Sequence, residues 1–177
     1  MDETYIELLI KKKLSPMEKV QIILIAVLTV LLSAASFFIP YIRTIALLFI
    51  AGLVYGSYYL ITSFAIEYEY SITNGEMDMD KIIAKRKRSR IITVKLREIE
   101  SIGKYSKNEH ENKRYDTKLF VCADEHDPQN SWYMTLRHNK MQHTLVVFTP
   151  DEKVLKNIRK YIPKQVDYDV FVRNRLG

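Results

Sequence analysis

The sequence predicts an α+β membrane protein, in which an N-terminal hairpin of two transmembrane helices is followed by one soluble domain. Residues 20–39 and 44–66 are long apolar runs without a charged side chain. The second run has 23 residues, which at about 1.5 Å each cover the roughly 30 Å hydrocarbon core of a bilayer. Polar and apolar residues alternate from Glu67, as in a β-strand, and the strands end in a capped amphipathic helix.

These patterns divide the chain into four parts. Residues 1–17 form a cytoplasmic N-terminal segment, residues 18–66 the transmembrane hairpin and residues 67–163 the soluble domain. Residues 164–177 form a C-terminal tail or one extra strand. The soluble part contains 22 Lys and Arg against 17 Asp and Glu, and a basic domain tied to a membrane favours an anionic leaflet or an acidic partner.

The N-terminal segment is polar with short apolar runs. Tyr5, Leu8 and Leu9 share the spacing of one stripe of a short helix. Four lysines precede the first apolar run, and we interpret them as a solvated segment beside lipid headgroups. A cleaved signal peptide is disfavoured, because the apolar run is longer than a signal sequence requires.

The two spans are joined by residues 40–43 alone, so both termini lie on the same side of the membrane. Positive charge flanks the outer ends of the hairpin, whereas the connecting loop contains only Arg43. The rule that cytoplasmic loops are rich in Lys and Arg therefore predicts a multi-pass protein of the cytoplasmic membrane with both termini in the cytoplasm.

Within the second span, Gly52 and Gly56 form a small-residue motif at which helix backbones can approach closely. We interpret it as packing within the hairpin, with a homodimer as the alternative. No charged residue lies inside either span, which argues against an ion-coupled transporter.

The soluble domain is predicted as a series of strands closed by one helix. Asn74-Gly75 is a strong hairpin turn, and the basic residues 85–90 form the next turn. Residues 104–117 are polar and are predicted as a long exposed loop. Thr149 is the expected N-cap of the closing helix, with Pro150 as its first residue and Glu152 completing a capping box. One face of this helix is apolar: Val154, Leu155, Ile158, Tyr161 and Ile162.

The first half of this domain resembles a known family. The similarity rests on Glu67-Tyr68-Glu69-Tyr70, Asn74-Gly75-Glu76, Asp78, Asp80-Lys81-Ile82, Lys87-Arg88, Arg90-Ile91 and Thr93-Val94, and on Tyr5-Ile6-Glu7-Leu8-Leu9. The family is an uncharacterised group of small bacterial membrane proteins with two helices and a cytoplasmic pleckstrin-homology-like (PH-like) domain. The resemblance implies a seven-stranded antiparallel β-barrel capped by the C-terminal helix. It supplies no catalytic residue.

The basic turn is the candidate contact surface for lipid or a partner. Five of its six residues are cationic: Lys85, Arg86, Lys87, Arg88 and Arg90. Each cation near an anionic bilayer contributes about 1 kcal/mol. A solvated hairpin tip balanced by carboxylates is the alternative. Nucleic acid is disfavoured, because the domain is also rich in acids and carries no recognition motif.

The remaining polar groups indicate no catalytic or metal chemistry. Glu76, Asp78 and Asp80 share one face of a strand, and we expect them to pair with Arg90 or Lys95 across the hairpin. The four histidines have no zinc-type spacing, and Cys122 is expected to be a small core or surface residue rather than a nucleophile. We therefore expect no enzyme activity, cofactor or metal.

The sequence thus predicts a membrane-anchored interaction module whose cytoplasmic domain contacts a protein partner. An anionic-lipid sensor is the second hypothesis. An accessory subunit of a transporter or stress-response system is the third.

Overall fold

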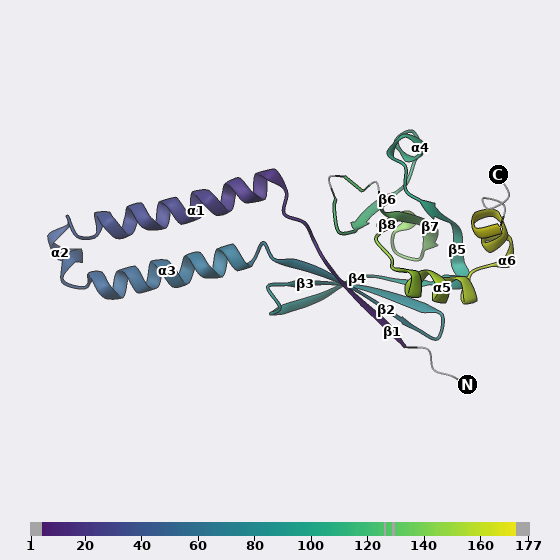
Figure 1. The fold of residues 1–177 in the computed structure, drawn as a ribbon, viewed down its shortest axis with the longest axis horizontal. Helices are drawn as coiled ribbons and strands as arrows, with labels where there is room; N and C mark the ends of the chain where they lie inside the picture. The colour runs from purple at the N-terminus through teal and green to yellow at the C-terminus, as the bar shows by residue number, and fades with distance from the viewer. Residues whose placement is uncertain (1–4, 126, 129, 173–177) are drawn as a thin grey trace. The chain divides into compact units, whose positions relative to one another are not determined.

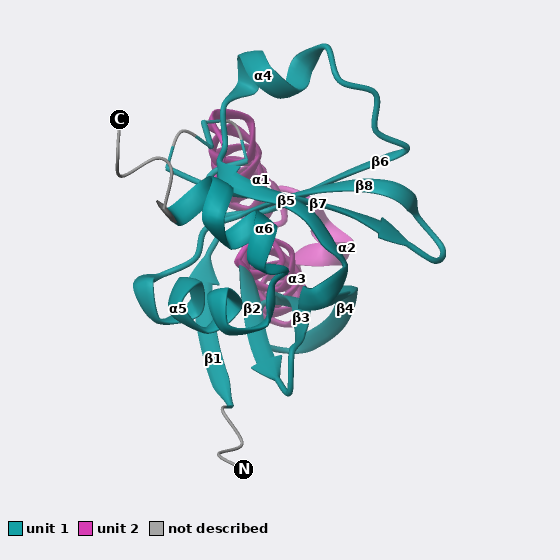
Figure 2. Cartoon of the chain, turned by 90° about the vertical axis from the view of Figure 1, so that its right-hand side faces the viewer, with its two compact units in different colours: residues 1–13, 67–177 teal, residues 14–66 magenta. Residues whose placement is uncertain are grey.

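The structure is a computed structural model that describes residues 5–125, 127–128 and 130–172. It divides into two compact units, shown in Figure 2. One unit, called the helical unit below, is residues 14–66; the other, called the domain, joins the chain up to Lys13 with the chain from Glu67 onwards.

The helical unit contains two long antiparallel helices joined by one short helix (Figure 1). They are α1 (Pro16–Ala35), α2 (Pro40–Arg43) and α3 (Ala46–Thr62). Helix α1 begins with a capping box, in which the Ser15 hydroxyl accepts from the Glu18 N–H and the Glu18 carboxylate accepts from the Ser15 N–H. Among the described residues, α1 alone is long and apolar enough to cross a membrane by length and composition, while α3 is a shorter apolar helix.

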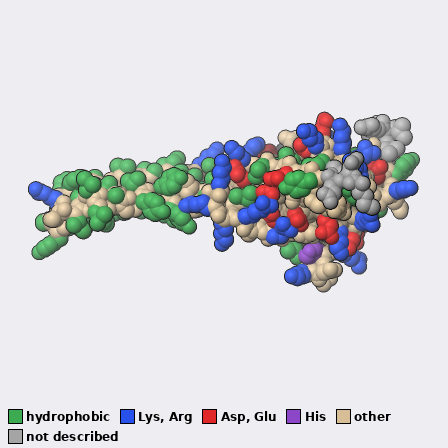
Figure 3. Space-filling model, turned by 90° about the horizontal axis from the view of Figure 1, so that it is seen from below, with side chains coloured by type: hydrophobic (Ala, Val, Ile, Leu, Met, Phe, Trp, Pro, Cys, Tyr) green, Lys and Arg blue, Asp and Glu red, His purple; other side chains and the backbone are tan. Residues whose placement is uncertain are grey.

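Both helices depart from the predicted runs 20–39 and 44–66: α1 begins earlier and ends at Ala35, and α3 covers only Ala46–Thr62 of the second run. At the end of the second span the helix ends at Thr62, because Ile66 already belongs to a strand. The side chains of α1 are not buried in this unit, and those of α3 are mostly exposed; Figure 3 shows the hydrophobic surface that results.

The first sheet of the domain is antiparallel and includes the N-terminal segment. Its order is β1 (Ile6–Lys11), β2 (Ile66–Thr73), β3 (Glu76–Ile83) and β4 (Lys87–Lys95). The prediction of a short helix with a stripe of Tyr5, Leu8 and Leu9 is wrong, because Ile6–Lys11 form strand β1. Ile6, Leu8 and Ile10 alternate with more exposed neighbours, which is the two-residue period of a strand. Pairing with β2 decides the conformation.

The hairpin turn Asn74-Gly75 is confirmed. Asn74 has a φ of 51° and Gly75 a φ of 84°, as a type I′ turn requires. The next turn also has two residues with positive φ, although neither is Gly or Asn: Ala84 has a φ of 53° and Lys85 a φ of 56°. The Arg86 N–H donates to the Ile83 carbonyl at 2.9 Å.

The second sheet has the strand order β5-β7-β8-β6. A short 3₁₀ turn η1 (Leu96–Glu98) leads into it. Its elements are β5 (Ile99–Lys104), α4 (Lys107–Glu111), β6 (Thr117–Val121), β7 (Trp132–His138) and β8 (Gln142–Phe148). The pair of β6 and β8 is parallel. Strand pairing in the described residues therefore gives two four-stranded sheets, rather than the seven antiparallel strands that the resemblance implies.

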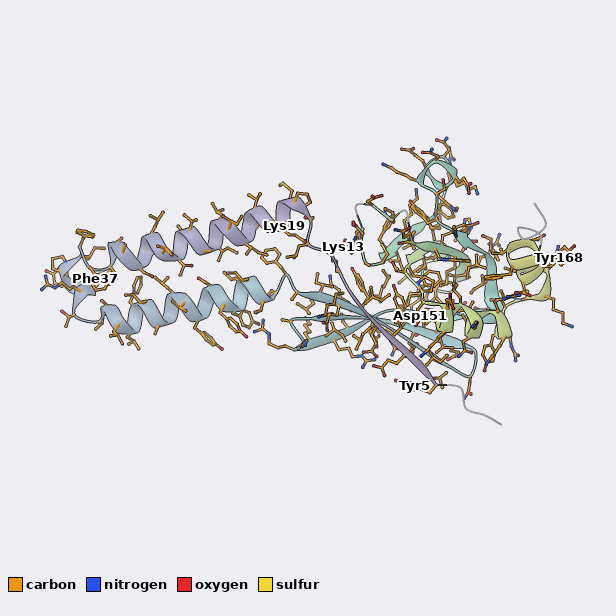
Figure 4. The ribbon with its side chains drawn as sticks, in the orientation of Figure 1. Tyr5, Lys13, Lys19, Phe37, Asp151 and Tyr168 are labelled. Carbon is orange, nitrogen blue, oxygen red and sulfur yellow. The ribbon has the colours of Figure 1, made fainter. Side chains whose placement is uncertain are left out.

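Helix α5 (Glu152–Tyr161) closes the domain, with Val154 and Ile158 buried. Its N-cap is Asp151, labelled in Figure 4, whose carboxylate accepts from the Val154 N–H at 2.7 Å. The predicted N-cap, Thr149, has another role. Its hydroxyl accepts from the Ala123 N–H at 3.1 Å, and its N–H donates to the Tyr70 hydroxyl at 3.2 Å. Because these contacts occupy the Thr149 hydroxyl and N–H, Asp151 caps the helix in its place, two residues later.

The segment after α5 is not a strand. Pro163 is the N-cap of α6 (Lys164–Asp167), and a π-helical turn η2 (Tyr168–Val172) follows. Arg159 of α5 fixes α6 through its Nε, which donates to Asp167 Oδ1 at 2.7 Å. The part of the predicted tail beyond residue 172 lies outside the described residues.

Candidate contact surface around the basic turn

The five predicted contact residues occupy one connection and the strand after it. Lys85 and Arg86 lie in the turn between β3 and β4, while Lys87, Arg88 and Arg90 belong to β4. All five are exposed residues, but they do not share one environment.

Arg88 and Arg90 are engaged in ion pairs with carboxylates of neighbouring strands. Arg88 Nη2 lies 2.7 Å from Asp80 Oδ2 and also contacts Glu69 Oε1. Arg90 Nη1 lies 2.7 Å from Asp78 Oδ1, and its Nε donates to Asp80 Oδ1. Glu69 and Asp80 are only 4% and 3% exposed, so the two arginines compensate buried charges.

A bulge in β4 sets Arg90 opposite Asp80, because Met79 pairs with Ile92 and the next residue, Asp80, pairs with Arg90. The register of β3 and β4 shifts between Met79 and Asp80, both of which are buried. The prediction that these carboxylates pair with Arg90 is confirmed for Asp78 and Asp80. Glu76 lies opposite Lys95 in the register.

The two buried carboxylates respond differently to this environment. Burial raises the pKa of Asp80, but hydrogen bonds from Arg90 and Arg88 outweigh it and hold the pKa below its ordinary value. For Glu69, burial outweighs the attraction of Arg88 and raises the pKa. Asp80 is thus stabilised as a carboxylate in the folded protein, whereas Glu69 is ionised at a cost.

Sequence reasoning missed the partner Glu69 because alternation assigns it to the solvent face of β2. Its neighbours Tyr68 and Tyr70 are buried, and so is Glu69 itself. The basic segment therefore contains two arginines with a structural role and three further exposed cations, Lys85, Arg86 and Lys87, called the outer basic residues below.

The turn lies at the end of the first sheet where the chain passes to the helical unit. In a hairpin with a two-residue loop at Asn74-Gly75, Ile83 lies opposite Ile66, the first residue of β2. On the other side of β2, Lys11 pairs with Glu67. The same end of the sheet thus presents the last residue of β1 and the basic turn.

Gly52 and Gly56 do not pack against α1. A Cβ atom at either glycine would meet nothing within 4 Å. Both glycines line an apolar groove of about 580 Å³ between α1 and α3. The helices contact each other instead through the hydroxyls of Thr29 and Ser57. Packing of the glycines within the hairpin is therefore not what the structure shows.

Residues 104–117 are mostly exposed, as predicted, but they contain helix α4 and an aromatic cluster around one buried side chain. His110 on α4 is 2% exposed, and its ring stacks on Tyr105 with 5.5 Å between centroids. Its Nδ1 hydrogen-bonds the Tyr115 hydroxyl at 2.7 Å, and the Tyr133 ring lies edge-on at 4.1 Å. The three tyrosines are the feature of the sequence that could have predicted this cluster.

Cys122 is a packed core residue, one of the two predicted environments. It is fully buried beside Leu145 and Val147, and burial raises the pKa of its thiol to about 11. Such a thiol is a poor nucleophile.

The comparison with protein families then identifies the architecture. The model of a bacterial PH-like domain family (DUF6106) matches residues 2–168. The chain belongs to this family. The match includes β1 and the helical unit as well as the strands, so the bacterial PH-like family spans both units of the chain. No curated protein and no solved structure matched the chain in these comparisons.

Proposed function

We propose that this bacterial PH-like protein is a membrane-anchored, non-enzymatic module whose cytoplasmic domain contacts a protein partner through the outer basic residues Lys85, Arg86 and Lys87. PH-like domains are generally interaction modules, which supports the class. The pairing of β1 with β2 is the observation that supports two crossings of the membrane.

This pairing constrains the membrane topology. β1 precedes the helical unit and β2 follows it, yet Ile6 pairs with Ile72 and Lys11 with Glu67 in one sheet. A sheet lies on one side of a bilayer, so the chain between these strands crosses an even number of times. Since α1 is long enough to cross once, the pairing supports a second crossing by α3. Its 17 residues are at the short end of the range for a spanning helix.

The orientation rests on the distribution of cations. Lysines flank the start of α1 and the basic turn follows α3, whereas the connection between the helices contains Arg43 alone. A cysteine is introduced by Lys87→Cys or, as the matched control, by Tyr41→Cys in the connection. An impermeant maleimide added to intact cells should label the second variant and not the first. Labelling of the first variant would exclude a cytoplasmic domain. The native thiol is buried and contributes little background.

The outer basic residues are the favoured contact because all three are exposed at the turn, whereas Arg88 and Arg90 pair with the buried carboxylates of Glu69 and Asp80. Anionic groups on a protein partner would gain by pairing with them. Anionic lipid headgroups offer the same attraction, so a lipid sensor is the second candidate, supported by the position of the turn at the sheet end where the chain passes to the helices.

A photo-reactive residue in place of Lys85 separates these candidates in membranes of the native organism. A discrete protein adduct supports the proposed function, whereas adducts with lipid alone favour the sensor. A photo-reactive residue in place of exposed Lys156 on α5 is the control. If neither adduct exceeds this control, the basic turn is not a contact surface. The full chain is required, because a fragment starting at Glu67 lacks β1.

Replacing Lys85, Arg86 and Lys87 together by Gln should reduce recovery of the cross-linked partner at least fivefold. The matched variant replaces Lys153, Lys156 and Lys160, which are exposed on α5, and removes the same net charge. An equal reduction by both variants would indicate an effect of net charge rather than of the turn.

A further inference from the structure

Strand β5 is an edge strand. It is the terminal strand of the second sheet, with β7 as its neighbour in the strand order, and helix α6 lies near it. Within the described residues, the backbone of residues 99–104 hydrogen-bonds to no segment other than β7. The outward N–H and C=O groups of an edge strand are able to pair with another extended chain.

A groove of about 610 Å³ follows this edge. Gly103 and Tyr133 are register partners and share one face of the sheet, whereas Ile102 and Lys104 face the other way. All four line the groove, so it continues around the strand edge and is not confined to one face. Its volume is within the range of ligand-binding clefts.

The walls of the groove are held by packed aromatic side chains. On one side, a Cβ at Gly103 would lie 3.0 Å from Tyr133 Cε1, so the absence of a side chain lets this ring lie against the strand. On the other side, Trp132 stacks on Phe171 of η2, with 5.6 Å between centroids and 16° between planes. The Arg159 guanidinium lies over the Phe171 ring, 4.5 Å from its centroid.

The ionisable side chains of the groove favour a cationic ligand. Among the described residues of the lining, Glu109 of α4 and Asp169 of η2 are anionic and Lys104 is the one cation. Their formal charges give a net of −1, in a domain that is basic as a whole. Trp132 and Tyr133 add aromatic surface, against which the stems and charged heads of Lys and Arg pack well.

We propose that this groove binds an extended basic peptide segment of a partner protein, which adds as a strand to the edge of β5. The backbone of the strand supplies hydrogen bonds, and alternate Lys or Arg side chains of the ligand meet Glu109 and the aromatic surface. The acidic groove and the basic turn are formed by different sheets and favour ligands of opposite charge. This inference is therefore independent of the proposed function.

The test uses the full chain in lipid nanodiscs and a random heptapeptide library displayed on phage. Enriched peptides should carry Lys or Arg at alternate positions. One such peptide is synthesised, together with a version that is N-methylated at alternate residues. Glu109→Gln should weaken its binding at least fivefold. Glu111→Gln is the matched control, because Glu111 is exposed on the same helix and does not line the groove.

N-methylation removes backbone donors without changing side-chain charge, and methylation at the residues that pair with β5 should weaken binding at least tenfold. Binding should also protect the β5 amides from hydrogen exchange. Failure to enrich basic peptides would overturn the proposal, as would equal effects of Glu109→Gln and Glu111→Gln. Unchanged binding of both alternately methylated versions would show that charge, and not strand addition, holds the peptide.

Discussion

Glu69 and Asp80 share Arg88 but should respond oppositely to loss of charge. Asp80→Asn removes the carboxylate that accepts from both Arg88 and Arg90. Breaking a fully buried pair costs about 3–5 kcal/mol. The side chains of Arg88 and Arg90 are 53% and 48% exposed, so water screens the interaction. We therefore expect Asp80→Asn to lower the free energy of unfolding by about 1–2 kcal/mol at pH 7.

Glu69→Gln should change the free energy of unfolding by less than about 0.5 kcal/mol or increase it. Burial raises the pKa of Glu69, so its ionised form is disfavoured in the folded protein at pH 7. The neutral amide removes this penalty. As the pH falls, the penalty disappears through protonation of Glu69 near and above its ordinary pKa of 4.5.

Asp80 shows the opposite dependence on pH. Its pKa in the folded protein is lowered, so its contribution is present above the ordinary value of 3.8 and is lost as the pH falls through the folded pKa. The difference between wild type and Asp80→Asn should therefore shrink below about pH 4.

Denaturant unfolding of the full chain in mild detergent measures both effects. Trp132 is the single tryptophan and stacks on Phe171, so its fluorescence reports on the domain rather than on the helices. Equal destabilisation by Glu69→Gln and Asp80→Asn at pH 7 would refute the reasoning, because it would mean that the two carboxylates are equally stabilised as anions.

Three further predictions concern other buried positions. Gly75→Ala should destabilise the domain by about 1–3 kcal/mol, because the residue has a φ of 84° and the new Cβ would lie 2.9 Å from Tyr161 Cδ1; an unchanged denaturant midpoint would contradict this. Asn157→Leu should leave the free energy of unfolding unchanged or raise it by up to about 1 kcal/mol, since the buried side chain has no hydrogen-bond partner among the described residues; a clear loss in the same assay would indicate an ordered partner for the amide. Burial and, to a smaller extent, the positive charge of Lys113 lower the pKa of His110. The contribution of His110 to stability is therefore lost as the pH falls below its ordinary value of 6.5. His110→Phe should reduce the loss of stability between pH 7.5 and pH 5.5 in parallel unfolding curves, and an identical loss in both proteins would count against this role.

The sequence by itself determined the features that depend on local pattern. The apolar runs locate α1 and α3, because a long uncharged apolar run can be recognised without knowing which distant residues lie beside it. Asn74-Gly75 determined its turn, since few residue pairs adopt two positive φ values easily. The apolar face of α5 follows from the helical period, and Val154 and Ile158 are buried as predicted.

Only the tertiary structure decided features that depend on distant partners. The segment Ile6–Lys11 becomes a strand because β2, some 60 residues later, offers its backbone groups. Arg88 has a structural role because it pairs with two buried carboxylates, Asp80 and Glu69, that belong to neighbouring strands. His110 is buried because three tyrosines from separate segments surround it. The groove along β5 likewise exists only because the sheet ends there and η2 returns beside it, which no local pattern in the sequence specifies.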